Sequence, residues 1–575
     1  MINLHIDNIS VEVEQGTTLL EAARQVNIHI PTLCYEEDLS IFGGCRLCVV
    51  EVDKGDLLQP ACATEAKEGM EVKTHSPRVR EVRQTLFELI IASHDITCEL
   101  NCLTCPRKTS CELREVAEDI NVSRMRLEPI YREQETDLSS YAVVREPHKC
   151  ITCDRCIRKC EEVQGIGIFA NSGRGPETTV TTFQEKGLGN VECTNCGQCI
   201  ISCPTGALHE VYHIDRVLEA LYDESKHVIV QTAPAVRVAI AEPFGSEPGT
   251  IATGQLVSAL RRLGFDGVFD TNFTADLTIM EEGTELVNRI ESGSNLPQLT
   301  SCSPGWIKFI EHFYPEYLDN LSTAKSPQQM FGALAKSYYA EKVGINIEDL
   351  VVVSIMPCTA KKFEAKRPEM DGDVDYVLTT REAATMIKSA GIDVTELAEE
   401  KHDRLMGVSS GAGDIFGSSG GVMEAALRSA YYLITGEELE ELDIESVRGL
   451  QGLKKAEVPI NEDLTIKVGV AHGLGNARKM MELIKSGEEF HFVEFMACPG
   501  GCIGGGGQPI SPELTQKETL NRRMKGIYDI DSNKKIRRSH ENPMIKNLYD
   551  EYLDRPGSHK AHKLLHTGYT SRDIR

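Results

Sequence analysis

The stretch Phe495-Met-Ala-Cys-Pro-Gly-Gly-Cys-Ile-Gly-Gly-Gly-Gly-Gln-Pro509 places two cysteines, Cys498 and Cys502, in a loop made largely of glycine. Glycine lets the backbone approach a bulky group closely and adopt positive φ angles. In a chain without signs of secretion, two thiols in such a loop indicate a metal cluster rather than a disulfide. Two further motifs, Thr300-Ser-Cys-Ser-Pro-Gly-Trp306 and Met356-Pro-Cys-Thr-Ala-Lys-Lys-Phe363, can join this loop only in a folded core.

The length and charge of the chain limit its architecture and partners. A chain of 575 residues is too long for one hydrophobic core, so we expect several domains. Its 61 basic and 87 acidic residues give a net charge of −26, which argues against nucleic acids and anionic membranes as partners. No apolar run approaches the roughly 20 residues that span a bilayer, and the start lacks a signal-peptide pattern. We therefore expect a cytoplasmic protein without membrane insertion.

Most of the twenty cysteines occur in closely spaced groups. Four groups of four precede residue 204, and four scattered cysteines follow them. A disulfide framework is not expected in a large chain from a reducing compartment, so the groups indicate metal clusters. Zinc is the competing interpretation for any single Cys-x2-Cys pair.

Residues 1–78 are expected to form the first iron–sulfur domain. Alternating side chains at 3–7 and 10–14 predict a hairpin, and residues 17–26 have helical spacing with a capping threonine. This order resembles the β-grasp fold of plant-type [2Fe–2S] ferredoxins, with a longer first gap between cysteines. A zinc knuckle is the alternative, which the preceding hairpin and helix disfavour. The four predicted ligands are Cys34, Cys45, Cys48 and Cys62.

Residues 79–120 are expected to form a second cluster domain. An amphipathic helix over 81–94 ends at a histidine, and the cysteines that follow resemble a His-x3-Cys-x2-Cys-x5-Cys motif for a [4Fe–4S] cluster. Four additional residues lie between the histidine and the rest of the motif. Either His94 or Cys98 is therefore predicted to complete a ligand set whose other members are Cys102, Cys105 and Cys111.

Residues 140–210 contain an internal repeat with the spacing of bacterial two-cluster ferredoxins, in which the fourth cysteine of each run binds the other cluster. Zinc is a poor explanation for two complete runs of this kind. One [4Fe–4S] cluster is predicted at Cys150, Cys153, Cys156 and Cys203. The other is predicted at Cys193, Cys196, Cys199 and Cys160.

Residues 211–575 have the pattern of an α/β domain. Continuous apolar runs begin at 227, 350 and 466, and the first two end at motif residues, which is typical of strands buried on both faces of a parallel sheet. Helical stretches at 284–290 and 328–341 lie between them. Functional residues directly after strand ends are the expected layout of such a domain. We expect two α/β lobes with the site between them.

The three motifs and the cluster modules before them resemble the clostridial-type modular [FeFe]-hydrogenases, and also the catalytic subunit of NAD(P)-linked electron-bifurcating hydrogenases. The resemblance implies an H-cluster, in which a [4Fe–4S] cubane joins a di-iron site carrying CO, cyanide and a bridging dithiolate. Cys358, Cys498 and Cys502 match cubane ligands, and Lys361 matches a lysine that contacts a cyanide. The remaining positions that match the pocket are Ala233, Pro234, Gln328, Met356 and Met496.

The pair Cys302-Ser303 departs from the family pattern of two adjacent cysteines, in which the first relays protons and the second binds the cubane. A serine oxygen is a harder and less acidic donor than a thiol, so it should bind iron less readily. Three interpretations remain open. Ser303 binds as an alkoxide, Cys302 becomes the ligand, or another group supplies the fourth position.

The resemblance also implies a proton path through Cys302, Glu282, Ser322 and Glu285. The two glutamates are three residues apart in a helical stretch, so they share a face. A buried carboxyl with a raised pKa can transfer protons near neutral pH. Without the resemblance, two solvated helix glutamates would be the simpler interpretation.

The expected activity is the reversible reduction of protons to H2, with one [2Fe–2S] and three [4Fe–4S] clusters relaying electrons to ferredoxin or to partner subunits. No glycine-rich nucleotide fingerprint follows a strand, so flavin and NAD(P) are expected on other subunits. Activity mainly within an NAD(P)H- and ferredoxin-dependent bifurcating complex is the alternative. An H2 sensor or an iron–sulfur scaffold is the alternative of another class, which the complete proton and electron paths disfavour.

Overall fold

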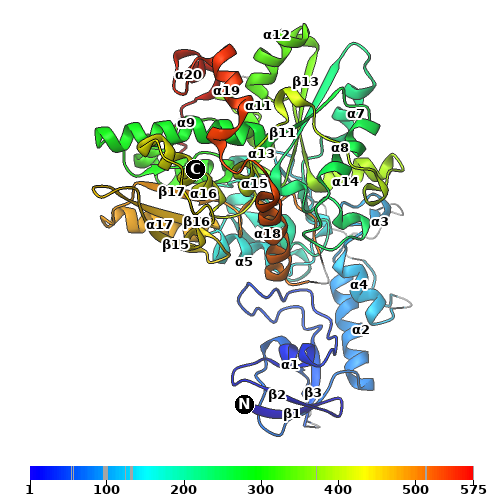
Figure 1. The fold of residues 1–575 in the computed structure, drawn as a ribbon. Helices are drawn as coiled ribbons and strands as arrows, with labels where there is room; N and C mark the ends of the chain where they lie inside the picture. The colour runs from blue at the N-terminus through cyan, green and yellow to red at the C-terminus, as the bar shows by residue number, and fades with distance from the viewer. Residues whose placement is uncertain are drawn as a thin grey trace.

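The computed structural model describes residues 1–53, 55, 57–94, 101–122, 125–129, 134–370, 372–511 and 514–573. Cys98 lies outside these residues. The N-terminal sheet, drawn in blue, lies at one end of the molecule, and the large α/β domain lies at the other, with α2 and α4 between them (Figure 1). Within the described part of the chain, no helix combines the length and apolar composition needed to cross a membrane.

The first module is a five-stranded sheet in the order β2-β1-β5-β3-β4 with helix α1 beside it. The predicted hairpin is present, because Asp7 and Asn8 take positive φ angles in the turn between antiparallel β1 and β2. Thr18 caps α1 in a reciprocal capping box with Glu21. The elements are β1 (Ile2–Ile6), β2 (Ile9–Val13), α1 (Leu19–Gln25), β3 (Val49–Val52), β4 (Gln59–Pro60) and β5 (Glu71–Lys73).

The second module begins with α2 (Pro77–Ile91), which Ser76 caps and which has proline at its first position. The predicted helix extended to His94, but the α-helix ends at Ile91, so the histidine lies in the turn that follows. Two short helices, α3 (Asn101–Thr104) and α4 (Glu112–Asp119), complete the described part of this module.

The third module is built from two similar halves. Each half has a helix that starts after a residue with a left-handed conformation, Asp154 before α5 and Gly197 before α6. Two antiparallel strand pairs, β6 with β9 and β7 with β8, accompany them. The elements are β6 (Val143–Arg145), α5 (Arg155–Arg158), β7 (Phe169–Ser172), β8 (Thr179–Thr182), α6 (Gln198–Ser202) and β9 (Leu208–Glu210).

Among the described residues, the α/β domain contains two four-stranded sheets. One sheet is parallel in the order β11-β10-β13-β14, and the other has the order β12-β17-β16-β15 with β15 antiparallel to its neighbour. The strands are β10 (His227–Thr232), β11 (Gly267–Asp270), β12 (Gln298–Leu299), β13 (Leu350–Met356), β14 (Tyr376–Thr379), β15 (Leu453–Pro459), β16 (Thr465–His472) and β17 (Phe492–Met496).

Helices cover both sheets, and the longest, α9, packs against α11, α15 and α16. The predicted helix over 328–341 is present as α11 followed by a π-turn and α12. The helices are α7 (Ile214–Tyr222), α8 (Thr253–Arg262), α9 (Thr271–Ser292), α10 (Pro304–Phe313), α11 (Pro327–Leu334), α12 (Ala340–Val343), α13 (Ala360–Glu364), α14 (Thr380–Ser389), α15 (Gly411–Ile415), α16 (Gly421–Thr435) and α17 (Leu474–Lys485).

The polar C-terminal segment is part of the same domain. It forms α18 (Gln516–Asn533), α19 (Pro543–Leu548) and α20 (His559–Leu565). Apolar side chains spaced along it, such as Leu548 and Leu565, are buried in the core around the parallel sheet. The segment therefore contributes to the core of the α/β domain although its composition is mostly polar.

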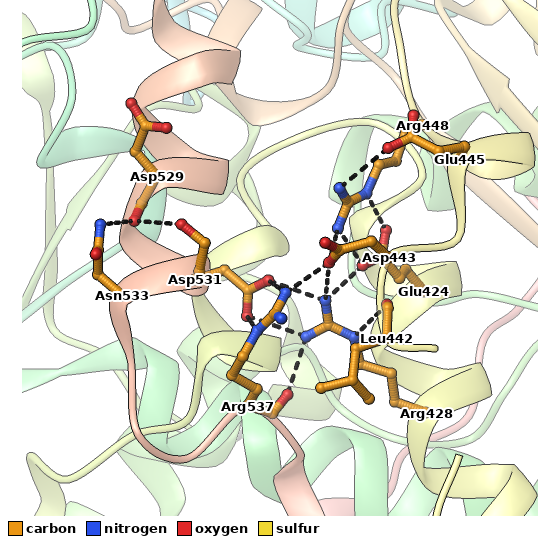
Figure 2. A network of polar contacts seen from close by, with 11 residues as sticks. Glu424, Arg428, Leu442, Asp443, Glu445, Arg448, Asp529, Asp531, Asn533 and Arg537 are labelled. Atoms are coloured by element: carbon orange, nitrogen blue, oxygen red, sulfur yellow. Dashed lines mark hydrogen bonds and ion pairs between the residues drawn. The ribbon is translucent and has the colours of Figure 1, made fainter. Parts of the chain in front are cut away.

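A buried ionic network fixes α18 to α16 (Figure 2). Three guanidinium groups, those of Arg428, Arg448 and Arg537, alternate with three carboxylates. Arg428 is fully buried, and all five of its N–H groups are used, two of them on Asp531 at 2.9 and 3.0 Å. The carboxylates belong to Glu424, Asp443 and Asp531. They come close enough together to suggest a metal site, but the arginines already neutralise them.

We expect Arg428→Met to lower the free energy of unfolding by about 3–5 kcal/mol, because it leaves buried carboxylates short of their partner. Urea unfolding followed by the fluorescence of Trp306, the chain's one tryptophan, measures this. The matched control is Arg522→Ala on α18, whose ion pair with Glu247 is exposed and should contribute less than about 1 kcal/mol. Equal losses in the two variants would contradict the role given to the network.

Candidate functional site

The central cavity lies where buried strands end. Ala233 and Pro234 follow β10, Cys358 follows β13, and Cys498 follows β17, and all four residues line the cavity. Parallel strands bring their carboxyl ends to one edge of a sheet, which is why motifs far apart in sequence meet here. Trp306 ties two motifs together, since its ring stacks on Phe495 with centroids 3.8 Å apart. Gln328, Met356 and Met496 also line the cavity.

Three thiols converge in this cavity, those of Cys358, Cys498 and Cys502. Burial raises the pKa of each thiol, and neighbouring sulfurs add to the effect at Cys498 and Cys502. Such a set of soft donors fits an iron–sulfur cluster, whose iron stabilises the thiolate form. The cavity also has an unsatisfied polar atom in its wall. This atom is Gln328 Oε1, which has no hydrogen-bond partner among the described residues.

Lys361 is held at the cavity by buried partners. Its Nζ donates to both oxygens of Glu364, at 2.9 and 3.0 Å, and to the carbonyl of Cys302 at 3.1 Å. The side chain is only 8% exposed. The sequence analysis missed Glu364, although its position three residues after Lys361 on a helix was a usable signal.

Cys302 and Ser303 both line the cavity but face different neighbours. Burial raises the pKa of the Cys302 thiol, and the nearby Glu282 and then Cys502 add to that shift. The Ser303 hydroxyl accepts a hydrogen bond from the Ala497 N–H at 3.2 Å, beside Cys498. The thiol is thus near the predicted proton path, and the hydroxyl is near the sequence that carries the cubane cysteines.

The predicted proton path includes a deeply buried carboxyl. Glu282 is 1% exposed, and neither of its carboxylate oxygens has a hydrogen-bond partner among the described residues. Burial, and then the charge of Glu285, raises the pKa of Glu282 to about 8, while the Ser322 hydroxyl opposes the shift. Ser322 Oγ donates to Glu285 at 2.8 Å, and Arg289 donates to the same carboxylate at 2.7 Å.

The ferredoxin cysteines line two separate cavities, each containing one cysteine from the opposite run. The first cavity contains Cys150, Cys153, Cys156 and Cys203. The second contains Cys160, Cys193, Cys196 and Cys199. These are the two groupings that the crossed spacing predicts.

The cysteines of the first module also lie together. The thiols of Cys48 and Cys62 are 3.3 Å apart, and Cys34 and Cys45 form a second hydrogen-bonded pair. The hydrogen bond from the partner thiol lowers the pKa of Cys34 to about 6 and that of Cys48 to about 7. Cys34 and Cys45 pack in the same cluster of side chains as Cys153 of the third module.

His94 is oriented as a metal-binding histidine would be. Its Nδ1 lies 2.9 Å from the carbonyl oxygen of Lys149, the residue before Cys150. This bond assigns the proton to Nδ1 and leaves Nε2 as the basic nitrogen. Cys105 packs against Gly206, where an added Cβ would meet its sulfur at 2.7 Å. The competing residue, Cys98, is outside the described residues, as are five others between the histidine and α3.

The second ferredoxin cavity adjoins the central cavity, because Cys196 lines both. The backbones meet with little room: a Cβ on Gly506 would lie 2.4 Å from the Cys196 carbonyl oxygen. Thr359 Oγ1 donates to the Asn195 carbonyl at 2.7 Å across the same junction. Sequence spacing alone gave no signal for this contact.

Family models match most of the chain. Residues 226–506 match the "Iron only hydrogenase large subunit, C-terminal domain", and residues 517–572 match the "Iron hydrogenase small subunit". Residues 1–77 match a "2Fe-2S iron-sulfur cluster binding domain". Residues 83–126 match the "NADH-ubiquinone oxidoreductase-G iron-sulfur binding region", and residues 140–209 match the "NADH-quinone oxidoreductase subunit 3, ferredoxin-like domain".

Similar proteins cover the whole chain or its catalytic half. The "NADP-reducing hydrogenase subunit HndD" of Solidesulfovibrio fructosivorans is 48% identical, covering 100% of this chain and 99% of the relative. "Iron hydrogenase 1" of Clostridium pasteurianum is 41% identical over 99% and 100% of the two chains. The structure of apo [FeFe]-hydrogenase HydA1 from Chlamydomonas reinhardtii is 46% identical, with a TM-score of 0.56, over 63% of this chain and 99% of that one.

These matches agree with the convergence of the three motifs on one buried cavity lined by thiols. The iron–sulfur modules that precede the catalytic half match family models of their own. The chain belongs to the [FeFe]-hydrogenases, the iron hydrogenases that act on H2.

Proposed function

We propose that the chain interconverts protons and H2 at an H-cluster held by Cys358, Cys498, Cys502 and Ser303. The observation that carries this proposal is the convergence of three motif thiols and a buried lysine on one cavity, which Cys302 and Ser303 also line. When bound, the H-cluster would supply the iron chemistry that splits and forms H2. The chain's own residues hold the cluster, exclude water and move protons.

The proton would pass between the Cys302 thiol, the Glu282 carboxyl, the Ser322 hydroxyl and the Glu285 carboxylate. With a pKa of about 8, Glu282 is mostly protonated at neutral pH and can donate and accept protons there. Lys361 keeps its ammonium group at the cavity, and its bond to the Cys302 carbonyl orients that segment. Fixed donors of this kind stabilise charge without having to reorganise.

Four further clusters would carry electrons. The [2Fe–2S] cluster belongs to Cys34, Cys45, Cys48 and Cys62, and two [4Fe–4S] clusters belong to the crossed ferredoxin sets. For the remaining [4Fe–4S] cluster we favour His94 over Cys98, together with Cys102, Cys105 and Cys111, because metal-binding histidines commonly donate their other ring N–H to a carbonyl, as Nδ1 does to Lys149. Cys196 then belongs to the cluster nearest the catalytic cavity, which it also lines.

A second proposal is that the chain works within an NAD(P)-linked complex. A relative that matches it along its whole length is named an NADP-reducing hydrogenase subunit, and two N-terminal models carry the names of NADH oxidoreductase subunits. The sequence contains no nucleotide fingerprint, so a partner would supply the NAD(P) and flavin sites. Ferredoxin is the alternative or additional electron partner. A sensor or scaffold would not need the buried proton path.

Infrared spectra test the catalytic proposal directly. In anaerobically matured protein, we expect sharp bands from CO and cyanide that shift when H2 replaces argon. The maturation system used should be one that activates a known [FeFe]-hydrogenase. If the protein matured in this system shows no such bands, the H-cluster assignment is ruled out. Co-purification with a flavin-containing subunit from the native host would separately support the complex.

Serine ligation at Ser303 can be tested without the di-iron site. We expect Ser303→Ala to lose cubane iron to a chelator roughly tenfold faster than the unsubstituted protein, because a ligand is removed, and Ser303→Cys to lose it more slowly, because thiolate is the softer donor. Cys302→Ser is the matched substitution and should leave the cubane in place. Iron content and the cluster's electron paramagnetic resonance give the readout. Cubane loss in Cys302→Ser with no effect of Ser303→Ala would assign the ligand to Cys302.

Glu282→Gln should lower H2 turnover by about 10²–10⁴-fold, because the amide cannot relay a proton. Glu291→Gln, an exposed position on the same helix α9, is the matched control and should retain activity. An active Glu282→Gln variant would show that protons take another route.

The same variant has a stability signature. The folded-state pKa of Glu282 is about 8, above the ordinary 4.5. The contribution of this carboxyl to the free energy of unfolding is therefore fully present below pH 4.5 and is lost as the pH rises to about 8. The amide has no such loss, so Glu282→Gln should gain stability relative to the unsubstituted protein over that window, by up to about 1.4 kcal/mol per pH unit. A stability difference that is independent of pH would contradict burial as the cause.

A further inference from the structure

A polar cavity, separate from the central cavity, lies at the outer end of the proposed proton path. It has a volume of about 620 Å³ and is lined by Glu285 from α9 and by His562 and His566 from the C-terminal segment. The other titratable groups that line it are Glu281, Arg289, Asp319 and Tyr569.

Hydrogen bonds connect His566 to the proton path. Its Nδ1 lies 2.8 Å from Thr323 Oγ1, and the Thr323 N–H donates to Glu285 Oε2 at 3.1 Å. On its other side, Nε2 lies 3.0 Å from Glu281 Oε2, a buried carboxylate that also accepts from Tyr549 Oη at 2.6 Å. His566 thus lies between the glutamate that ends the path and a second, buried glutamate.

The two histidines differ in exposure. Their rings stack with centroids 4.7 Å apart and planes within 4° of parallel. His562 is exposed, whereas the His566 side chain is 6% exposed. Stacked rings do not hydrogen-bond to each other, but His562, His566 and Glu285 line the same open cavity, so a proton taken up by the outer ring can reach the inner ring and Glu285 through the solvent of that cavity.

We propose that His562 and His566 form a proton-collecting pair that loads and unloads Glu285. This inference rests on the proposed function, because it assumes that Glu285 is the outer end of the path. The two residues act as positioning and relay groups and would not touch the H-cluster.

The reason for such a pair is the scarcity of hydronium ions near neutral pH. At a diffusion-limited rate constant of about 10⁹–10¹⁰ M⁻¹ s⁻¹, hydronium at pH 8 delivers only about 10–100 protons per second to a single group. Enzymes commonly turn over at about 1–10³ s⁻¹. Histidine titrates close to neutral pH, so an exposed histidine takes protons from buffer as well as from hydronium.

The test is chemical rescue of His562→Ala in the matured protein. In weak buffer we expect this variant to evolve H2 roughly three- to tenfold more slowly at pH 8 and at nearly the unsubstituted rate at pH 6. Imidazole, which the open cavity can admit, should restore the rate at pH 8 in a saturable way. Substituted imidazoles should restore it in proportion to their pKa, a dependence that mere filling of space does not produce.

Two controls separate this inference from the proposed function. His559→Ala, an exposed histidine at the start of the same helix, should behave like the unsubstituted protein, and the infrared spectrum of His562→Ala should be unchanged. If Glu282→Gln is inactive while His562→Ala has the unsubstituted pH profile, the histidine pair is not a proton collector. Rescue that is independent of imidazole pKa overturns the inference as well. If Glu282→Gln is active, the proposed path itself fails.

Discussion

The catalytic half depends on the close passage of one glycine-rich loop between two other backbones. A Cβ on Gly505 would come within 2.2 Å of the Pro357 carbonyl oxygen, and one on Gly506 within 2.4 Å of the Cys196 carbonyl oxygen. Side chains at these positions would push the loop away from both the β13 motif and the ferredoxin module. The same contact that gathers Cys358, Cys498 and Cys502 therefore sets how close the second ferredoxin cavity lies to the central cavity.

Burial is the second constraint, and it acts on thiols and carboxyls in the same direction. The environment disfavours charge, so it raises the pKa of Cys502 and Glu282 alike. Bound iron would reverse this for the thiols, because it stabilises the thiolate. At Glu282, burial and the charge of Glu285 outweigh the opposing charge of Arg289, so this carboxyl keeps its proton near neutral pH. One desolvated region can thus hold thiols suited to a metal cluster and, close to them, a carboxyl suited to carry protons.

Much of the fold and site could be predicted, because cysteine spacing is local and buried strands have continuous apolar patterns. The crossed sets of Cys160 and Cys203 follow from the repeat, and the strand before Cys358 follows from its composition. The packing of the polar tail could not be predicted, since Arg428 and Asp531 are 103 residues apart and look like surface charges in sequence. Nor does spacing tell which neighbour Cys302 faces.

The tail matters for more than stability. Residues 517–572 match a model named for a separate small subunit, yet here the same chain provides them and the ionic network around Arg428 fixes them to α16. The same segment places His566 within hydrogen-bonding distance of Thr323, whose N–H bonds Glu285. Loosening the tail would therefore change the surroundings of Glu285, the outer member of the proposed proton path. In this chain, the anchoring of the C-terminal segment and the polar cavity beside Glu285 are properties of the same packing.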